Sequence, residues 1–537
     1  MDATVNGYDW AGAARRAGIG ADGAFNSATL RFDQRRALIW RRADGRAEVF
    51  SGADLTRLGA DLAQALARVG IGPGDRVAAK LGRRPESFAL PLALWRLGAI
   101  YVPLFSGFGV EAISVRLADS GCAAIVVDAA NAASVQGARG AVDGLRVLAL
   151  GGSVPAAEQD VDLDAALERA PGEPRLHPTA ATDPATIMYT SGTTGKPKGC
   201  VVPHYGVLTL WPFVEHALAM RSGGVLLSTA DAGWSFGLYT TGLAPLSLGA
   251  TRVIIEGAFD AAEWWRIARE LGADHLASAP TGFRQLAAAG TDVLRAEFPT
   301  SLRAATSCGE PLTAEVDGWF RENLDFPIYD SYGATELGIV MADLRDPAQD
   351  QALLGGMGQV LPGFDVALLD ESGEEVEEGI GRVAVRDHGW LLSRGYWDRE
   401  EVWNERLRDG WWWTEDLVER RAGRYRYVSR ADDIIVTAGY NVGPADVEAV
   451  LVEHPEITDA ACVGVADARK GLVVAAFVVV DPAGEDAGRQ ERLLEEGRRL
   501  VGERIGWHAA PRSIHRVEAI PRTESGKVIR RGFKESA

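Results

Sequence analysis

Much of the first 340 residues alternates short apolar segments with segments of helical spacing, and this alternation constrains the fold most. Residues 76–80, 124–128 and the apolar run 185–189 are strand-like, whereas residues 261–271 show helical spacing behind Asp260, a candidate N-cap. Strands that alternate with helices usually form parallel sheets covered by those helices. The pattern predicts an α/β fold built from parallel-sheet subdomains.

The pattern changes after about residue 355. Short alternating segments with glycine-rich turns, at residues 363–369 and 381–385, predict a small β-barrel. Beyond residue 430, a helix opened by Pro444, two strand-like runs and a charged helix over about 489–503 predict a small separate α+β domain. We expect a large N-terminal domain over residues 1–430 and a C-terminal domain over residues 431–537.

Composition narrows the functional class. The 47% hydrophobic content fits a globular protein, and the net charge of −18 argues against nonspecific nucleic-acid binding, which needs a basic surface. The four cysteines lie far apart without a CxxC pair or Cys/His cluster, so free thiols and no zinc site are expected. Met1 is not followed by a signal peptide pattern, and the longest apolar runs, such as residues 472–480, are too short to span a bilayer. We expect a cytoplasmic protein with no nucleic-acid partner and no membrane span.

The run from Tyr189 to Gly199 concentrates glycines, hydroxyl side chains and two lysines in eleven positions. Glycines let a backbone turn its N–H groups towards oxyanions, hydroxyls donate further hydrogen bonds, and lysine supplies a compact positive charge. The run therefore predicts a polyphosphate-binding loop. It is not a Walker A motif, because Gly192 and Gly195 are too close together and Pro197 stands where serine or threonine should follow the lysine.

The run instead resembles the phosphate loop of the adenylate-forming superfamily, which includes acyl-CoA synthetases, peptide-synthetase adenylation domains and luciferases. The resemblance extends from about residue 37 to residue 531, with the main elements of the family in order. It implies an N-terminal AMP-binding domain and a mobile C-terminal domain, and it places Lys198 among the catalytic residues. The implied nucleotide-binding residues of the loop are Thr190, Ser191, Gly192, Thr193, Thr194, Gly195 and Lys196.

A second element, Asp330-Ser-Tyr-Gly-Ala-Thr-Glu336, closely resembles the Y-G-x-T-E element of that superfamily. The resemblance implies that Tyr332 stacks on adenine, that Thr335 contacts phosphate and that Glu336 holds Mg²⁺ through oxygen, the ligand atom this ion prefers. Asp330, Ser331 and Gly333 are assigned to the same nucleotide site. The string at residues 307–311 resembles the adenine wall of the family, formed here by Gly309, Glu310 and Pro311.

Later motifs complete the resemblance. Trp413-Thr-Glu-Asp416 resembles the T-G-D element whose aspartate binds the ribose hydroxyls, although Glu415 replaces the usual glycine. Arg430 resembles the ribose-contacting arginine, and Asp432 the hinge about which relatives rotate the C-terminal domain. Residues 521–527 resemble the last motif, in which Lys527 bridges the acid and the α-phosphate and stabilises the developing charge.

The implied acceptor is CoA. Residues 438–444, with Gly439, Tyr440 and Asn441, resemble the segment that forms the pantetheine tunnel. Asn441 and Gly502 stand where some relatives carry arginines that contact CoA, so this part of the resemblance is less complete than the adenylation motifs.

The implied acid is larger than acetate. Acetyl-CoA synthetases put a tryptophan where this chain has Gly333, and removal of that indole deepens the acyl pocket. Trp234, Phe236 and Gly237 are expected to line the pocket with Gly333, and their apolar character suits an aliphatic or aromatic acid. Residues 230–237 and 279–285 resemble most the branch of medium-chain and aromatic acyl-CoA synthetases. The resemblance therefore implies an ATP-dependent acid:CoA ligase that uses ATP, Mg²⁺ and CoA on a medium-chain or aromatic acid and releases AMP and pyrophosphate.

Other functions stay open at this point. The chain could adenylate an acid for a different acceptor, or activate an unusual oxyanion such as nitrite, since Asn441 and Gly502 weaken the CoA motifs. A noncatalytic nucleotide-binding sensor is a rival of another class, disfavoured by the presence of Lys527, Glu336 and Asp416. The sequence leaves open the identity of the acid, the pathway and the oligomeric state.

Overall fold

The computed structural model describes residues 4–152, 160–168, 174–190, 197–312, 314–344, 356–437, 440–467, 471–480, 489–522 and 528–536. The chain forms two compact units. The described part of the first covers residues 4–344, 357–365 and 385–412, with the gaps given above, and that of the second covers residue 356 and residues 366–384 and 413–536. The boundary expected between residues 430 and 431 stays a prediction.

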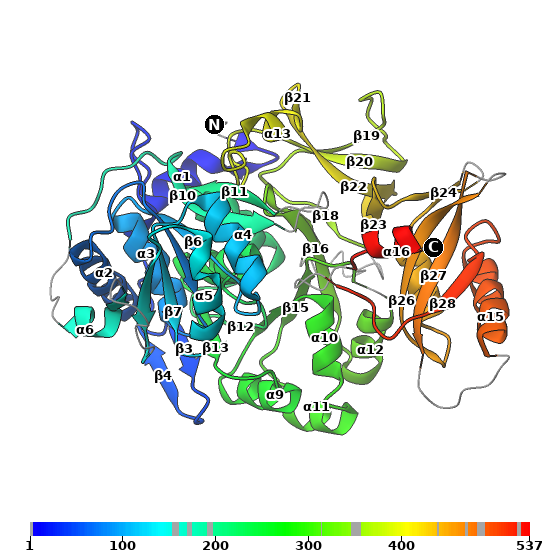
Figure 1. Cartoon of the computed structure of the whole chain (residues 1–537), viewed down its shortest axis with the longest axis horizontal. Helices are drawn as coiled ribbons and strands as arrows, with labels where there is room; N and C mark the ends of the chain where they lie inside the picture. Colours follow the sequence, from blue (N-terminus) through cyan, green and yellow to red (C-terminus); the bar gives the residue numbers. More distant parts are fainter. Residues whose placement is uncertain are drawn as a thin grey trace. The chain divides into compact units, whose positions relative to one another are not determined.

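The first unit contains a seven-stranded sheet (Figure 1). Neighbouring strands are parallel except for the β10–β11 hairpin at one edge. Helices α4 and α5 cover one face, where Leu117 and Val135 pack against Val102 and Ile125. In sheet order the strands are β11 (Lys198–Pro203), β10 (Pro184–Thr190), β6 (Ile100–Pro103), β5 (Arg76–Lys80), β7 (Ala124–Asp128), β8 (Arg146–Leu150) and β9 (Val161–Asp162). The associated helices are α2 (Gly52–Arg68), α3 (Glu86–Arg96), α4 (Val110–Ser120), α5 (Ala132–Ala138) and α6 (Leu163–Glu168).

A nine-stranded sheet forms the other half of this unit. Its central strands are parallel, and antiparallel strands close both edges. In sheet order the strands are β18 (Gln359–Val360), β17 (Gly338–Ala342), β16 (Ile328–Ala334), β15 (Ala304–Cys308), β14 (His275–Ser278), β12 (Val225–Ser228), β13 (Thr251–Ile255), β3 (Leu38–Arg41) and β4 (Ala47–Phe50). The helices α9 (Ala261–Glu270), α10 (Pro280–Ala287), α11 (Thr291–Glu297) and α12 (Ala314–Leu324), drawn in green in Figure 1, contribute to one apolar core with these strands.

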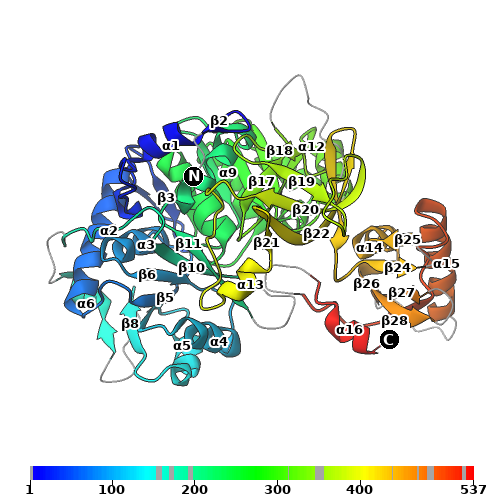
Figure 2. The ribbon, with the colours of Figure 1, turned by 90° about the horizontal axis from the view of Figure 1, so that it is seen from above.

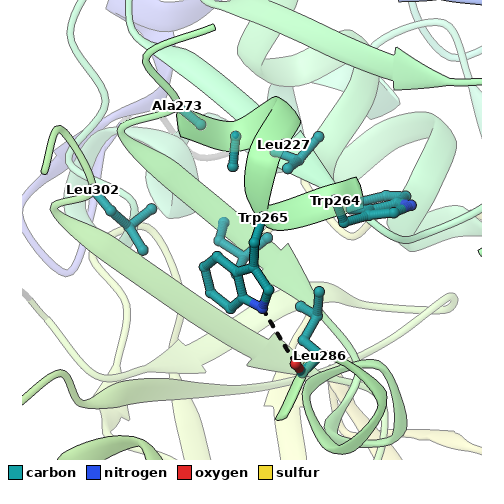
Figure 3. A pocket seen from close by; sticks show the side chains of 8 residues that line it. Leu227, Trp264, Trp265, Ala273, Leu286 and Leu302 are labelled. Carbon is teal, nitrogen blue, oxygen red and sulfur yellow. Dashed lines mark hydrogen bonds between the residues drawn. The ribbon is translucent and has the colours of Figure 1, made fainter. Parts of the chain in front are cut away.

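Helix α9 shows why these residues fold as they do. The Asp260 carboxylate caps the helix by accepting a hydrogen bond from the Glu263 N–H at 2.7 Å, as expected for an N-cap. Trp264 and Trp265 are buried against the sheet. Both indoles line a small apolar cavity, of about 10 Å³, together with Leu227, Leu286 and Leu302 (Figure 3). Trp265 Nε1 donates to the Leu286 carbonyl at 3.2 Å. A cavity of this size holds at most one water, so it is a packing defect of the core rather than a substrate site.

Shorter elements complete the first unit. Near the N-terminus are β1 (Thr4–Val5), β2 (Tyr8–Asp9), α1 (Trp10–Ala17) and the 3₁₀ turn Ser27–Thr29, and a second 3₁₀ turn covers Arg139–Ala141. Between β11 and β13 in the sequence are α7 (Gly206–Thr209), a π-helix over Phe213–Ala217, a π-helix over Phe236–Leu243 and α8 (Ala244–Ser247). Helix α13 (Glu400–Asn404) follows the segment 393–399, which contacts the candidate site.

A five-stranded sheet forms where the alternating segments predict a small barrel. Its order is β19 (Val366–Leu369), β20 (Gly379–Arg386), β22 (Trp411–Arg421) and β21 (Leu407–Arg408), and β23 (Arg424–Arg430) pairs with β22. Thr414 Oγ1 donates to the Val383 carbonyl at 2.9 Å and fastens β22 to β20.

The C-terminal part of the second unit is an α+β sandwich (Figure 2). Its strands are β25 (Tyr440–Val442), β24 (Ile435–Thr437), β27 (Gly471–Val480), β26 (Ile457–Asp467) and β28 (Ser513–Arg516), in sheet order with β28 paired to β27. Cys462 and Val474 face α14 (Pro444–Leu451) and α15 (Arg489–Arg504), whereas their neighbours Val463 and Ala475 face Phe533 of α16 (Arg531–Ser536). Alternate residues of each strand thus serve two different cores, as the period of two requires.

The expected fold class is confirmed: parallel α/β sheets, a small antiparallel sheet and a C-terminal α+β domain are all present. The four cysteines are free and buried. Among the described residues, no helix combines the length and apolar character needed to cross a bilayer.

Candidate active site

The β10–β11 hairpin carries the predicted phosphate loop. Thr190 ends β10, Lys198 begins β11, and the two lie opposite each other in the antiparallel ladder. The structure therefore brings together the first nucleotide-binding residue and one catalytic candidate. The predictions for Ser191, Gly192, Thr193, Thr194, Gly195 and Lys196 lie outside the described residues.

An ion pair that the sequence analysis missed joins both ends of that loop. The Tyr189 hydroxyl donates to the Asp119 carboxylate at 2.8 Å. Arg399 binds the other oxygen of Asp119, and its Nη1 donates to the Pro197 carbonyl at 3.2 Å. Tyr189 and Pro197 flank the loop, so the Asp119–Arg399 pair contacts the chain on both sides of the loop and links its two ends.

Two neighbouring parallel strands, β15 and β16, carry the predicted adenine site. Strand β15 stops at Cys308, just before Gly309, Glu310 and Pro311, and it pairs in parallel with β16, where Cys308 lies opposite Ser331. The Ser331 hydroxyl donates to the Ser307 carbonyl at 2.7 Å. Side chains that follow neighbouring parallel strands meet at one edge of a sheet, which is where ligands bind in such folds. The structure thus places the two predicted adenine segments side by side.

Thr281 is a further residue of this edge that the sequence analysis missed. It is the second residue of α10, which follows β14, and its hydroxyl lies 3.1 and 2.9 Å from the two carboxylate oxygens of Glu310. Arg284, one turn along α10, approaches the same carboxylate at 3.6 Å. Glu310 is therefore fixed by α10, and Gly309 adopts a left-handed φ of 97° at the turn that precedes it.

Asp330 is buried at the same edge. Burial raises the pKa of its carboxyl well above the usual range, and the nearby Asp343 carboxylate acts in the same direction. Asp343 also accepts a hydrogen bond from the Asp330 N–H at 3.0 Å. Among the described residues, Asp330 Oδ1 has no hydrogen-bond partner. A buried carboxyl oxygen without a partner is costly, and a donor on a bound base would satisfy it.

The Thr335–Glu336 element is fastened to residues 393–396. The Tyr396 hydroxyl donates to Glu336 Oε1 at 2.8 Å, and Ser393 binds the carbonyls of both Thr335, through its hydroxyl at 2.8 Å, and Glu336, through its N–H at 3.0 Å. The Lys198 ammonium lies 5.2 Å from the centroid of the Tyr396 ring, within cation–π range. The structure therefore brings together three of the four predicted catalytic residues, namely Lys198, Thr335 and Glu336.

Glu336 fits the role of a magnesium ligand. The carboxylate is only partly buried, and among the described residues no hydrogen bond reaches its second oxygen, Oε2. The described residues contain no cluster of three acidic, cysteine or histidine side chains suited to a metal. A lone carboxylate is sufficient for Mg²⁺ in nucleotide enzymes, since this ion is commonly held by one or two carboxylates together with substrate phosphates. Burial and the Glu336 charge raise the pKa of Tyr396, so the tyrosine remains the donor in the pair.

The predicted acid-pocket residues lie at the start of the π-helix over Phe236–Leu243 and on β16. Trp234 packs against Phe105 and Phe108, with ring centroids 5.3 and 5.5 Å apart. A Cβ on Gly237 would lie 1.9 Å from the Asp231 carbonyl oxygen. One on Gly333 would lie 2.1 Å from the Gly338 carbonyl oxygen. Both glycines therefore permit close backbone contacts, and a side chain at either position requires the backbone to move.

In the second unit the predicted ribose residues form one cluster. Asp416 and Arg430 lie opposite each other on β22 and β23, with 3.6 Å between their charged atoms. Arg430 Nε also donates to Asp432 Oδ1 at 3.1 Å. One guanidinium thus joins the ribose-binding candidate to the hinge candidate. The extra side chain of Glu415 points to Arg382, 3.8 Å away, so it is accommodated without displacing Asp416 from this pair.

The hinge candidate is also joined to the C-terminal helix. Lys534 donates to the Asp432 carbonyl and to the Asp433 carboxylate, both at 3.0 Å. Arg530 makes two hydrogen bonds of 2.7 and 2.8 Å to Glu448, which is partly buried. The sequence analysis missed this network because its members are far apart in the chain.

The CoA-segment predictions are described only in part. Gly439 lies outside the described residues, as does Lys527. Tyr440 is 58% exposed and stacks on His508 at 4.6 Å, and Asn441 pairs with Val436 in the sheet. The indole of Trp507 covers Gly502, where an added Cβ would lie 2.7 Å from the ring.

Comparisons with known proteins agree with this arrangement. Residues 25–397 match the family model described as AMP-binding enzyme, and residues 446–527 match that of the AMP-binding enzyme C-terminal domain. The chain is 29% identical to the acetyl-coenzyme A synthetase of Bacillus subtilis over 99% of this chain and 94% of that protein.

Two solved structures extend the comparison. An acyl-CoA synthetase from Brucella canis is 35% identical, with a TM-score of 0.75 over 98% of this chain and 97% of that one. The amide bond synthetase McbA from Marinactinospora thermotolerans is 27% identical, with a TM-score of 0.80 over 98% of this chain and 99% of the other.

Proposed function

The chain belongs to the AMP-binding enzyme family, and from that premise we propose that it activates a medium-chain or aromatic carboxylic acid with ATP and transfers the acyl group to CoA. It is an AMP-forming acid–thiol ligase of the acyl-CoA synthetase group. Enzymes of this group use ATP, Mg²⁺ and CoA.

One observation carries the proposal: Tyr396 connects Lys198 with Glu336. The hairpin residue next to the phosphate loop and the carboxylate suited to Mg²⁺ are held by one side chain, with a 2.8 Å hydrogen bond on one side and a cation–π contact on the other. A fixed cation beside a fixed carboxylate is an arrangement that orients a metal–polyphosphate complex.

In the first half-reaction the substrate carboxylate attacks the α-phosphorus of ATP, and pyrophosphate leaves. Lys198 and Thr335 bind phosphate oxygens, and Lys527 stabilises the charge that develops between the acid and the α-phosphate. Glu336 would hold Mg²⁺, which when bound offsets the phosphate charge. Asp330 and Tyr332 receive the adenine, and Asp416 and Arg430 bind the ribose. The role of Asp330 is supported by its Oδ1, which has no hydrogen-bond partner among the residues that the structure describes.

In the second half-reaction the CoA thiol attacks the carbonyl carbon of the acyl adenylate, and AMP leaves. Asp432 acts as the hinge between the two half-reactions, and Gly439, Tyr440 and Asn441 accept the pantetheine arm. The 3.1 Å contact of Arg430 with Asp432 supports this assignment, because it couples the nucleotide-binding arginine to the residue at which the chain turns.

The acid class rests on the pocket residues. This chain has Gly333 where the resemblance expects the tryptophan of acetyl-CoA synthetases, and Gly333 packs directly on the backbone of β17. Trp234 and Phe236 contribute aromatic side chains, and the rings of Phe105 and Phe108 pack against Trp234. These features support an acid with more apolar surface than acetate.

A second candidate function is the transfer of the adenylate to an amine. Asn441 and Gly502 replace the arginines expected towards CoA, and the fold and length match those of an amide bond synthetase. In this version the adenylation half-reaction is unchanged, and only the nucleophile of the second step differs.

Acid-dependent ATP–pyrophosphate exchange tests the first step. We would assay acetate, hexanoate, decanoate, benzoate, cinnamate and anthranilate, and then measure AMP release with and without CoA or an amine. Strong exchange with hexanoate, decanoate or an aromatic acid, together with AMP release stimulated by CoA, is the expected result. Preference for acetate would contradict the acid class, and stimulation by an amine alone would favour the second candidate. Absence of exchange with every acid would refute adenylation of these acids.

A further inference from the structure

We propose that Tyr396 is a positioning residue for the adenylation step, orienting the Glu336 carboxylate for Mg²⁺ while its ring holds Lys198 in place. This inference rests on the proposed function, because it takes Glu336 as the metal ligand. Tyr396 lies sixty residues after Glu336 in the sequence and belongs to none of the motifs that the sequence analysis used. Its assignment comes from contacts alone.

The hydroxyl of Tyr396 fixes one oxygen of Glu336. It donates to Oε1 at 2.8 Å, and the tyrosine is only 7% exposed, so water competes weakly for the bond. The second oxygen, Oε2, has no hydrogen bond within the described part of the chain. A carboxylate held by one oxygen cannot rotate freely, and it presents the other oxygen as a single, directed ligand. Such partners of metal ligands set ligand orientation and contribute strongly to metal affinity.

The ring of Tyr396 is itself held in place. Trp403 of α13 packs edge-on against it with 5.4 Å between centroids, and the backbone of Tyr396 forms a bridge with Cys200 of β11. The Lys198 ammonium lies over the ring at 5.2 Å. Tyr396 therefore contacts two of the predicted catalytic residues through different parts of one rigid side chain.

The segment around Tyr396 ties two separate elements together. Its backbone exchanges hydrogen bonds with β11, from Arg394 N–H to the Val201 carbonyl and from Val201 N–H to the Gly395 carbonyl, both at 2.9 Å. Ser393, at the start of the segment, binds the carbonyls of Thr335 and Glu336. The phosphate hairpin and the element that carries Glu336 belong to different sheets. Residues 393–396 are bonded to both and therefore fix the distance between them.

The test uses Tyr396→Phe, which removes only the hydroxyl. The chain offers a matched control in Tyr8→Phe, because the Tyr8 hydroxyl also donates to a glutamate, Glu215 Oε2, at 2.9 Å. We would measure the Mg²⁺ dependence of ATP–pyrophosphate exchange at fixed ATP. Y396F should raise the half-saturating Mg²⁺ concentration about tenfold, with the KM for the acid changed less than about twofold because the pocket is untouched, whereas Y8F should match the wild type.

A second readout does not depend on turnover. Electron paramagnetic resonance would follow Mn²⁺ binding to the full chain in the presence of a non-hydrolysable ATP analogue. Y396F should weaken Mn²⁺ binding about tenfold, and in a Glu336→Gln background it should have no further effect, because the residue that it orients no longer carries the charge. The Mn²⁺-binding measurement tests the role of Tyr396 even if no acid supports exchange. A lack of exchange with every acid would count against the proposed function and not against the role of Tyr396.

Three results would overturn the proposal. They are unchanged Mg²⁺ and Mn²⁺ dependence in Y396F, equal weakening in Y8F, or full additivity of Y396F with E336Q. Thermal unfolding of each variant confirms that it is folded, and Tyr396→Leu, which removes both hydroxyl and ring, repeats the binding measurement if Y396F does not fold.

Discussion

Arg399 and Asp119 form an ion pair although 280 residues separate them in the sequence. Each partner also contacts one side of the phosphate hairpin: Asp119 accepts from Tyr189, and Arg399 donates to the Pro197 carbonyl. The loop between Tyr189 and Pro197 therefore begins and ends at one charged pair. A glycine-rich loop gains most from fixed ends, because its own backbone has little conformational preference.

Asp119→Asn should weaken ATP binding more than it weakens the fold. The substitution keeps the size of the side chain but leaves the Arg399 charge without its partner, so the loop ends are held less firmly. We expect the KM for ATP in the exchange assay to rise about tenfold, equivalent to about 1.4 kcal/mol. The control is Arg16→Met, which breaks the ion pair between Arg16 and Glu215. Neither residue belongs to the phosphate hairpin, so the KM for ATP should stay unchanged. An equal effect of both variants would mean that the pair is merely structural.

Lys527→Ala should separate the two half-reactions. Loss of a cation that stabilises developing charge costs roughly 10²–10³-fold in rate, so adenylation should fall by that amount. Formation of the thioester from supplied acyl adenylate should stay within a few-fold of the wild-type rate. The nearby Lys534→Ala, which removes contacts to Asp432 and Asp433 instead, provides the comparison. Equal loss of both half-reactions in K527A would argue against the assigned role.

Phe236 rather than Gly333 is the position at which to alter the acid pocket. Even alanine at Gly333 would press on the Gly338 carbonyl, so G333A should destabilise the protein by about 1–3 kcal/mol. Gly72→Ala, in open space, should be neutral. Phe236→Ala should shift preference towards bulkier acids by about 10- to 200-fold in relative kcat/KM, measured on the same acid panel. The half-buried Phe259, which packs on the α9 core, gives the control F259A, whose acid profile should not move.

His204 should make the fold sensitive to mild acid. Burial lowers the pKa of its imidazole from 6.5 to about 4, and its Nδ1 accepts a hydrogen bond from the Ser27 N–H. Between those pH values the unfolded chain binds a proton that the folded chain does not. The contribution of neutral His204 to the free energy of unfolding is therefore complete above pH 6.5, and it is lost as the pH falls towards 4.

The measurement is the free energy of unfolding at pH 7.5 and pH 5. The wild type should lose about 2 kcal/mol more than His204→Asn over this interval, because asparagine can accept the same hydrogen bond but does not titrate. His216→Asn, at an exposed position, should follow the wild type. Parallel curves for the wild type and H204N would show that His204 does not carry the effect.

Local sequence features predicted much of the fold because they act over a few residues. The N-cap at Asp260 and the helical spacing behind it give α9 almost to the residue, Ala261–Glu270 against the expected 261–271. The strands over residues 76–80 and 124–128 are found at those bounds. The alternation of buried and exposed residues within one helix or strand depends on residues close together in the sequence, so the period of the hydrophobic residues predicts it.

The order of strands and the supporting side chains could not be predicted in this way. Strand β3, from near the N-terminus, pairs with β13 more than 200 residues later, and no local pattern encodes that partner. Tyr396 and Glu336, like Arg399 and Asp119, are ordinary residues in sequence and become informative only when the fold places them in contact. The motif residues could be named from resemblance, whereas their supports depend on tertiary structure.

The reactivity of the four buried cysteines can report on unfolding of the protein. Cys122 and Cys200 sit in the first unit and Cys462 in the sheet of the second, and burial raises the pKa of all three thiols. A thiol reagent therefore meets neither an exposed sulfur nor a reactive thiolate until the surrounding structure opens. Timed alkylation followed by peptide mass analysis would record the opening of each unit separately, without any engineered label.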